Sequence, residues 1–281
     1  ADQWFSVSRG LEAAVADSCI SRLAAHPSAE CGDELAELAA EYPARSKLYR
    51  AYYDPEQPLL VPPRRPSGEA LRVAPNRYDR AGVPGRPPAY EEGTPLQYSF
   101  MAPHDAPGLR TLVGGPAALS ARLDLLFDGA APEVDGQQDL ETGNIGSHCQ
   151  GNEPGHHAPY LYNVAGRHDR TQRVLSRLHA LYTDQPDGLP GNDDTGQTSA
   201  WFVFTSLGLY PLDPCGGTYE LGRPFVAAAN LSLPGGAILR VRTKGRMHAD
   251  AVAQVVWQGD DGLRTPLNGT TISHAQLVRG G

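Results

Sequence analysis

Four carboxylates in glycine-bounded turns are the residues of this chain whose types and spacing could do chemistry. Glu153 lies in the turn Q-G-N-E-P-G-H-H, Asp193 and Asp194 lie in G-L-P-G-N-D-D-T-G, and Glu92 lies in Y-E-E-G beside aromatic residues. Hydrolysis of a glycosidic bond needs one protonated carboxyl group beside the leaving oxygen and a second that activates water or attacks carbon. The residues alone therefore favour Glu153 opposed to Asp193 and Asp194 across a pocket.

Each of these carboxylates also has a structural interpretation. Asp193 or Asp194 could cap the N-terminus of the helix that follows, and Glu153 could favour the positive end of a helix. The presence of several such turns in one helical region favours the catalytic interpretation, because caps alone do not require glycine and aromatic residues around them.

The turn around Glu153 is also rich in oxygen ligands. Gln150, Asn152 and Glu153 together with backbone carbonyls form a set that suits Ca²⁺, although a simple Gly-Asn turn has the same composition. His156 and His157 do not have the spacing of a zinc motif, because adjacent residues on a helix point about 100° apart. We expect one of these histidines to line a pocket and the other to be packed.

Aromatic residues near these turns offer two interpretations. They could form faces on which a sugar stacks, or they could belong to the core, which is commoner for aromatic residues at helical spacing. The residues concerned are Trp201, Tyr90, Tyr98, Tyr160 and Tyr162.

The elements that must position these turns are mostly helical. Apolar residues recur at helical spacing through the first 213 residues, with caps and prolines at the expected ends. The predicted helices cover Ser6–Ala25, Asp33–Tyr53 with a break or kink at Pro43, a segment opened by Gly115-Pro116, one opened by Glu153-Pro154, one capped by Asp169, and Gln197–Tyr210, which Pro211 stops.

Other stretches lack this helical pattern. Residues 54–88 are rich in Pro, Arg and Gly, which predicts a long surface loop. After Pro214 the apolar runs become short and alternate between glycine-rich turns, which predicts strands. The predicted strands are 231–233, 238–242 and 252–257, and we place a domain boundary near Asp213.

Bulk properties exclude several classes of partner. The 281 residues carry a net charge of −8 and no basic run, so nucleic acid is not an expected partner. No apolar run is long enough to cross a bilayer. The four cysteines allow up to two disulfides, and Asn230 and Asn268 each begin an acceptor motif for glycosylation, which together favour a secreted protein. The N-terminal Ala1 suggests a processed end or a cut within a longer chain.

Two long motifs and several shorter ones follow one another in order along the chain. G-N-E-P-G-H-H-A-P-Y-L-Y-N is followed by G-L-P-G-N-D-D-T-G-Q-T-S-A-W-F-V-F and L-G-L-Y-P. Upstream lie S-V-S-R-G-L-E at Ser6, R-S-K-L-Y at Arg45, E-G-T-P-L-Q-Y at Glu92 and P-H-D at Pro103. Over nearly the whole chain, this series resembles the calcium-dependent exo-α-mannosidases of glycoside hydrolase family 92.

The resemblance implies a fold and an activity. The fold is mainly α with a smaller β region: the C-terminal part of an (α/α)₆ helical barrel at residues 1–213, followed by β-sandwich strands at 214–281. The activity is removal of terminal α-linked mannose from glycans with inversion, using Ca²⁺ bound to vicinal hydroxyls of the sugar. The family's N-terminal part, which would precede this chain, is then an expected partner.

The resemblance also assigns roles to residues. It moves the general acid from Glu153 to Glu92 and makes Asp194 the general base, supported by Asp193 or Asn192. The two catalytic carboxylates should then lie roughly 6.5–9.5 Å apart. The residues implied for metal binding are Gln150, Asn152 and Glu153, and those predicted for substrate binding are His156, His157, Asn192, Gln197 and Trp201.

Three departures from the family pattern keep other hypotheses open. Leu96 stands where the family usually has Trp, Thr94-Pro95 replace its usual residues, and Asn192 replaces a common Asp. A non-catalytic glycan-binding protein that retains the pocket is therefore the alternative function. An incomplete barrel, which needs its missing half to fold, is a third hypothesis.

Overall fold

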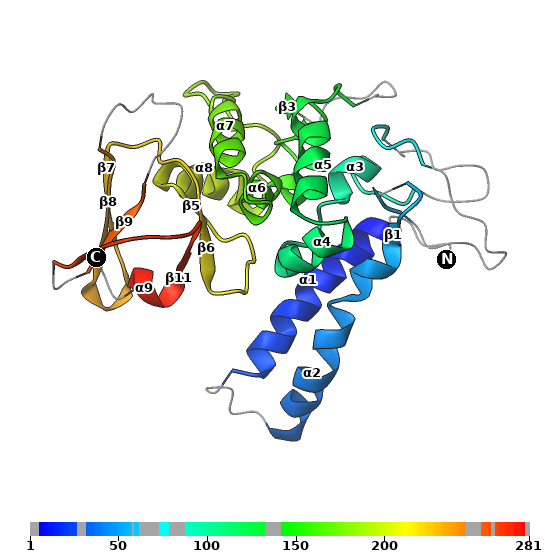
Figure 1. Ribbon diagram of the computed structural model, residues 1–281, viewed down its shortest axis with the longest axis horizontal. Helices are drawn as coiled ribbons and strands as arrows, with labels where there is room; N and C mark the ends of the chain where they lie inside the picture. The colour runs from blue at the N-terminus through cyan, green and yellow to red at the C-terminus, as the bar shows by residue number, and fades with distance from the viewer. Residues whose placement is uncertain are drawn as a thin grey trace.

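The computed structural model shows helices first and strands second along the chain (Figure 1). The structure describes residues 6–26, 32–57, 59–61, 73–78, 88–132, 142–244, 254–259 and 262–278. Much of the predicted loop at 54–88 therefore lies outside the described residues, as does Cys31.

The first two helices form an antiparallel hairpin that projects from the body of the molecule (Figure 1). Helix α1 spans Ser6–Ala24 and α2 spans Gly32–Arg45. Pro43 lies within α2, which ends two residues later, and a 3₁₀ helix at Leu48–Tyr52 follows. Since proline lacks the N–H of the helical ladder, the predicted single helix to Tyr53 is divided here.

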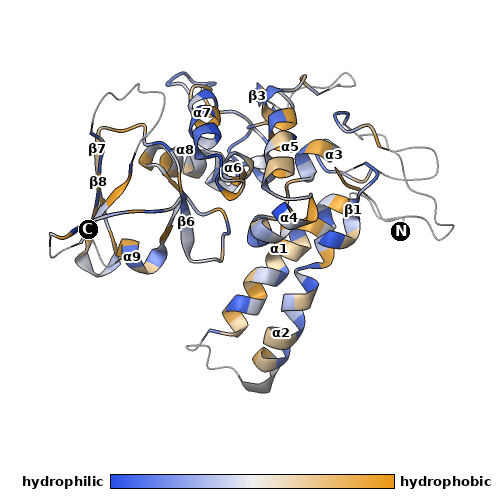
Figure 2. Ribbon diagram, viewed as in Figure 1, coloured by the Kyte–Doolittle hydropathy of each residue, from blue (hydrophilic) through white to orange (hydrophobic). Residues whose placement is uncertain are grey.

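The body of the molecule is a group of short helices around one apolar core. These are α3 Pro95–Tyr98, α4 Ala106–Leu112, α5 Pro116–Asp128, α6 Leu161–Val164, α7 His168–His179 and α8 Gln197–Leu207. Hydrophilic and hydrophobic residues alternate along α7 (Figure 2), and the apolar face buries Val174, Leu175 and Leu178. This is the pattern expected of a helix with one side against a core.

Two of the predicted helices have different bounds. The segment opened by Glu153 forms 3₁₀ turns at Glu153–Gly155 and Ala158–Tyr160 before α6, so it is helical only in short pieces. Helix α8 ends at Gly208, which adopts the left-handed conformation with φ 80°, rather than at Pro211. A glycine at this position satisfies the last carbonyls of the helix without the steric cost of a side chain.

The strands form small separate sheets. β5 Leu209–Tyr210, β6 Thr218–Leu221 and β11 Thr271–Ser273 make a three-stranded sheet, so β5 pairs across the predicted boundary at residue 213. Pairs are formed by β7 Ala228–Ser232 with β8 Ile238–Arg242, and by β9 Val256–Gln258 with β10 Arg264–Pro266; α9 spans His274–Val278. The order of helices before strands is thus confirmed, while the barrel and the sandwich remain predictions.

Two further hairpins lie on the helical side. β1 Tyr53–Asp54 pairs with β2 Leu59–Leu60, and β3 Asn144–Ile145 pairs with β4 His148–Cys149. The prediction of a surface loop from residue 54 was wrong for its first part, because Leu59, Leu60 and Val61 are buried in the main core.

A disulfide ties the first helix to the start of the β region. Cys19 of α1 bonds Cys215, which lies 196 residues further along the chain. An ion pair between Arg22 and Asp213, with N and O 2.6 Å apart, runs beside it. The sequence left the pairing open; the structure shows that one bridge anchors α1 near the boundary between helices and strands.

Candidate active site

The Glu92 turn is held through its backbone by three side chains, two of which are distant in sequence. The Glu91 N–H donates to Ser8 Oγ (2.7 Å), and Tyr98 Oη donates to the Glu91 carbonyl (2.7 Å). Asn152 Nδ2 donates to the Glu92 carbonyl at 2.5 Å. The backbone is therefore fixed on both sides of Glu92, while the Glu92 side chain itself is exposed.

The residues that depart from the family pattern build a capped helix next to this turn. Thr94 Oγ1 accepts from the Gln97 N–H, and Gln97 Oε1 accepts from the Thr94 N–H, which together form a capping box. Pro95 takes the first helical position, where its missing N–H costs nothing. Leu96 is buried, so the altered sequence here forms a defined helix start.

The second acidic turn leads into α8. The Asp193 carboxylate accepts hydrogen bonds from the Ser199 N–H (2.7 Å) and from Ser199 Oγ (2.8 Å). It thus satisfies a backbone donor in the first turn of α8, although the residue at the N-cap position of this helix is Gly196. Asp194 and Asn192 beside it are exposed, so Asp194 is the carboxylate of this turn that is open to a ligand.

Unusual backbone conformations gather in these two turns. Among the described residues, the non-glycine residues with positive φ are Glu92 (43°), Asp193 (57°) and Thr195 (55°). Such conformations cost free energy in residues with a side chain, and they persist where the surrounding structure holds them, often at functional sites. Both predicted catalytic turns carry this feature, and Asp194 lies between two of the three residues.

Glu153 connects the two turns. Its carboxylate accepts a hydrogen bond from Thr198 Oγ1 of α8 at 3.3 Å. Burial raises the pKa of Glu153, and the negative charge of Asp194 raises it further. Since Asn152, the preceding residue, contacts the Glu92 backbone, the structure brings Glu92, Glu153 and Asp194 into one neighbourhood.

The same neighbourhood offers oxygen ligands to a hard cation. Among the described residues, no group of three or more His, Cys, Asp or Glu side chains could hold a metal ion. The carboxylates of Glu153 and Asp194, whose negative charges repel each other, nevertheless fit a Ca²⁺ ion that takes its remaining ligands from carbonyls, water or substrate. The donor chemistry is therefore compatible with the predicted metal.

Gln150 differs from the other predicted metal ligands because it is completely buried. Its Oε1 lies 3.0 Å from His148 Nε2, and its Nε2 donates to Tyr182 Oη at 2.9 Å. Its backbone carbonyl accepts from His156 Nε2 at 2.8 Å. To bind a metal through its side chain, Gln150 would have to break these hydrogen bonds. In this structure its buried side chain instead stabilises the turn from the protein interior.

The two histidines after Glu153 are both buried. His156 Nε2 donates to Gln150, and its Nδ1 lies 3.3 Å from Gln197 Nε2, which fixes the tautomer. His157 Nε2 donates to the Phe100 carbonyl at 2.7 Å. Burial lowers the pKa of each to about 4, so both are neutral at pH 7. We expected one histidine to be packed and the other to line a pocket, but both are packed, so the predicted role of His156 and His157 in substrate binding is corrected.

The aromatic residues near the two turns belong to the core rather than to an open sugar-binding face. Trp201 is fully buried, donates from Nε1 to the His156 carbonyl at 3.0 Å and stacks on Tyr182 with ring centroids 5.6 Å apart. This burial is a correction to its predicted role in sugar binding, because its faces are covered by protein. The remaining aromatic candidates are buried as well: Tyr90, Tyr98, Tyr160 and Tyr162.

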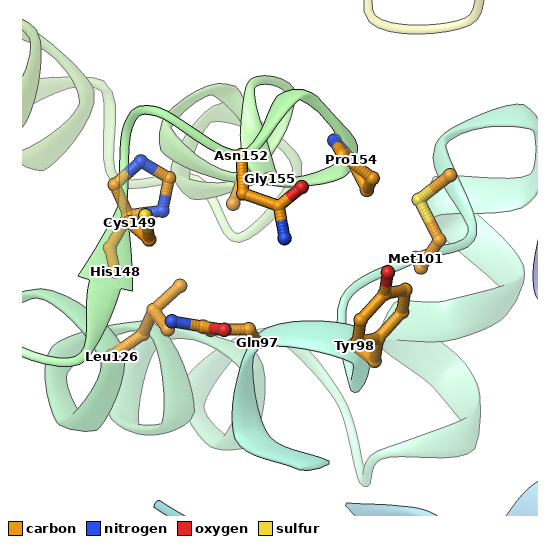
Figure 3. A pocket seen from close by; sticks show the side chains of 10 residues that line it. Gln97, Tyr98, Met101, Leu126, His148, Cys149, Asn152, Pro154 and Gly155 are labelled. Carbon is orange, nitrogen blue, oxygen red and sulfur yellow. The ribbon is translucent and has the colours of Figure 1, made fainter. Parts of the chain in front are cut away.

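A small pocket lies behind the Glu92 turn (Figure 3). Asn152 and Pro154 line it on one side, and Gln97 and Tyr98 on the other. Its lining includes Asn152 but not the carboxylates of Glu92 or Asp194. This pocket therefore does not coincide with the predicted catalytic carboxylates.

Sequence reasoning missed two residues that contact the site. Ser8 holds the Glu91 peptide, and Thr198 donates to Glu153. Both lie inside motifs noted above, S-V-S-R and G-Q-T-S, but serine and threonine at helix starts are also typical caps. Only the contacts between distant segments distinguish the two roles.

The fold and the two acidic turns are those of a glycoside hydrolase, and comparison with known proteins gives the family. The model of the glycosyl hydrolase family 92 catalytic domain matches residues 1–281. This chain belongs to glycosyl hydrolase family 92.

Solved structures agree with this assignment. The chain is similar to the family GH92 alpha-mannosidase BT3965 from Bacteroides thetaiotaomicron in complex with mannoimidazole, with 27% identity, a TM-score of 0.82, and coverage of 99% of this chain and 35% of that chain. It is also similar to the family GH92 inverting mannosidase BT2199 from the same organism, with 27% identity, a TM-score of 0.76, and coverage of 98% and 36%.

A curated sequence relative is fungal. An uncharacterized secreted glycosidase of Arthroderma benhamiae is 32% identical over 146 residues, which are 52% of this chain and 17% of that protein. The chain thus spans about a third of the length of the solved relatives and less of the fungal one. Among the described residues, no helix has the length and apolar character to span a membrane.

Proposed function

We propose that this chain is the part of a calcium-dependent, inverting exo-α-mannosidase that carries both catalytic carboxylates. The observation that supports the proposal most is the contact chain from Glu92 through Asn152 and Glu153 to Asp194. It brings together acidic groups that are distant in sequence, as a two-carboxylate mechanism requires. The mannosidase names of the similar solved structures supply the substrate class.

In the proposed mechanism, Glu92 is the general acid. Its exposed carboxyl group donates a proton to the glycosidic oxygen as the bond from that oxygen to the anomeric carbon breaks. Asp194 is the general base and takes a proton from the water whose oxygen forms the new bond to the anomeric carbon. Attack from the face opposite the leaving group inverts the configuration, so α-linked mannose is released as the β anomer.

Asn152, Glu153 and Asp194 would hold the cation in this proposal. When bound there, Ca²⁺ supplies positive charge that binds vicinal hydroxyls of mannose and favours a distorted ring. The Thr198 hydroxyl would keep the Glu153 carboxylate in position through its hydrogen bond. Asp193 would bind the start of α8 so that Asp194 keeps its position.

The proposal is tested on the full-length protein with an α-mannoside. We expect release of mannose that a chelator abolishes and added Ca²⁺ restores, with β-mannose as the first anomer seen by NMR. Glu92→Gln should lower kcat by about 10²–10⁴-fold, whereas the neighbouring Glu91→Gln is the matched control and should lose much less. Activity that is indifferent to chelation, or α-mannose as the first product, would contradict the proposal.

The glycan-binding alternative makes the opposite prediction for the same assays. It expects mannose to bind without turnover, and Glu92→Gln to leave that binding unchanged. Secretion of the protein is likewise a proposal, which the name of the fungal relative supports.

A further inference from the structure

The Glu91 peptide is enclosed by two buried hydroxyl groups that the proposed mechanism does not use. Ser8 Oγ accepts from the Glu91 N–H and Tyr98 Oη donates to the Glu91 carbonyl, each at 2.7 Å. Ser8 and Tyr98 are only 3% and 5% exposed. The backbone of Glu91, the residue directly before Glu92, is thus bound at both its N–H and its carbonyl, which belong to the two peptide groups that flank this residue.

The first turn of α1 contributes more than the Ser8 hydroxyl. The N–H groups of Val7 and Ser8 both donate to the Ala89 carbonyl, at 3.0 and 3.3 Å. These donors have no partner within their own helix, because the first turn of a helix leaves its N–H groups unpaired. The start of α1 therefore forms hydrogen bonds with the backbone of two residues before Glu92, Ala89 and Glu91.

The backbone conformation of Glu92 is one that needs stabilising contacts of this kind. A residue with a side chain pays free energy to hold φ at 43°, so neighbouring contacts must stabilise it. Burial raises the pKa of Tyr98, so its hydroxyl stays protonated and can donate to the Glu91 carbonyl. Ser8, Tyr98 and the Glu91 backbone form one cluster.

We infer that Ser8 and Tyr98 are positioning residues for the general acid: they hold the Glu91 peptide so that the Glu92 carboxyl reaches the leaving oxygen. This inference rests on the proposed role of Glu92. Neither residue touches the substrate in this scheme. A loss of their hydroxyls should therefore displace the acid without removing it, and a displacement of about 1 Å can cost about 10²-fold in rate.

A comparison of leaving groups separates this role from a merely structural one. A mannoside with a dinitrophenolate leaving group needs little protonation, whereas an alkyl mannoside or a mannobiose depends on the acid. Ser8→Ala and Tyr98→Phe should lower kcat on the alkyl mannoside by about 10- to 100-fold. On the dinitrophenyl mannoside, the same variants should stay within about threefold of the wild type, because the base and the water are unaffected.

Matched controls are present in the chain. Ser8→Thr keeps the hydroxyl and should recover most of the activity that Ser8→Ala loses. Ser18→Ala removes a similarly buried hydroxyl from the same helix, and Tyr90→Phe removes one that donates to Leu60 instead of Glu91. Both should leave the ratio of the two rates unchanged.

The outcomes decide between the inference and the function on which it rests. Equal loss on both substrates, or no loss on either, in Ser8→Ala and Tyr98→Phe would overturn the positioning role while leaving Glu92 as the acid. The role of Glu92 as the acid has a test of its own. Of all the variants, Glu92→Gln must show the largest difference between its loss of kcat on the alkyl mannoside and its loss on the dinitrophenyl mannoside. If Glu92→Gln shows no such difference, the assignment of the acid fails and the inference fails with it.

Discussion

The two acidic turns of the site are held by different contacts next to their predicted catalytic residues. Beside Glu92, Ser8 lies 83 residues from Glu91, whose N–H it binds, and Asn152 lies 60 residues from Glu92, while Tyr98 adds a contact with Glu91 over seven residues. Beside Asp194, Asp193 contacts Ser199 only six residues away, while the Gly191 N–H at the start of the turn donates to the distant Thr142 Oγ1. The acid is thus held chiefly by distant segments, and the residue next to the base is held by the start of the following helix.

This difference indicates which substitutions should displace the acid and which should displace the base. Changes in the first turn of α1 should disturb the acid and leave the base in place. Changes in the first turn of α8 should do the reverse. The predictions below test this division, beginning with the largest expected effect.

Asp194→Asn should lower kcat by about 10²–10⁴-fold on both alkyl and dinitrophenyl mannosides. The reason is that the attacking water still needs a base when the leaving group does not need an acid. Steady-state kinetics on both substrates measures it. The division between acid and base turns would break down if Asp194→Asn showed the same preference for the dinitrophenyl substrate as Glu92→Gln.

Replacing both Cys19 and Cys215 with serine should lower the free energy of unfolding by roughly 2–5 kcal/mol. The disulfide joins residues 196 apart and anchors α1, the helix whose start holds the acid turn. Denaturant unfolding of the oxidised wild type and the variant measures the change. An unchanged unfolding midpoint would show that α1 is held without the bridge.

The stability of the protein should fall as the pH decreases from about 6.5 to about 4, in part because of His157. Burial lowers the pKa of His157 to about 4 in the folded state, against about 6.5 when unfolded. Within this window the unfolded chain binds more protons than the folded protein, so acid favours unfolding. Over the whole range, His157 should lower the free energy of unfolding by about 3 kcal/mol.

His157→Gln tests this contribution, since glutamine keeps a donor for the Phe100 carbonyl but does not titrate. Thermal unfolding of the variant should show a shallower dependence on pH than the wild type. A slope identical to that of the wild type would exclude His157 as a source of the acid sensitivity. His156, also lowered to about 4 by burial, should retain its share.

Asp193→Ala should destabilise the protein by about 1 kcal/mol, the usual cost of losing a helix cap. It should also lower activity equally on both leaving groups, because Asp194 is displaced and Glu92 is not. Asp193→Asn is the matched control, since asparagine tolerates positive φ and still offers an acceptor to Ser199. A preference for the dinitrophenyl substrate in Asp193→Ala would contradict the local origin of the base turn.

The sequence by itself determined the kinds of group available and the family. Long motifs around Glu153 and Asp194 identified the family, which the whole-chain match confirmed. Apolar spacing predicted α1, α5 and the order of helices before strands, because these depend on local periodicity. The start of α5 at Pro116 follows from local chemistry in the same way.

Only the tertiary structure decided which polar residues are accessible and which contact each other. Gln150, His156 and His157 lie in the same turn as Asn152 and Glu153, and Trp201 lies in the motif of Asp194, yet the structure buries these four residues. Burial depends on which distant segments pack over a turn, and the spacing of residues within the turn does not record this. For the same reason, the contact between Asn152 and Glu92 became visible only once the chain was folded.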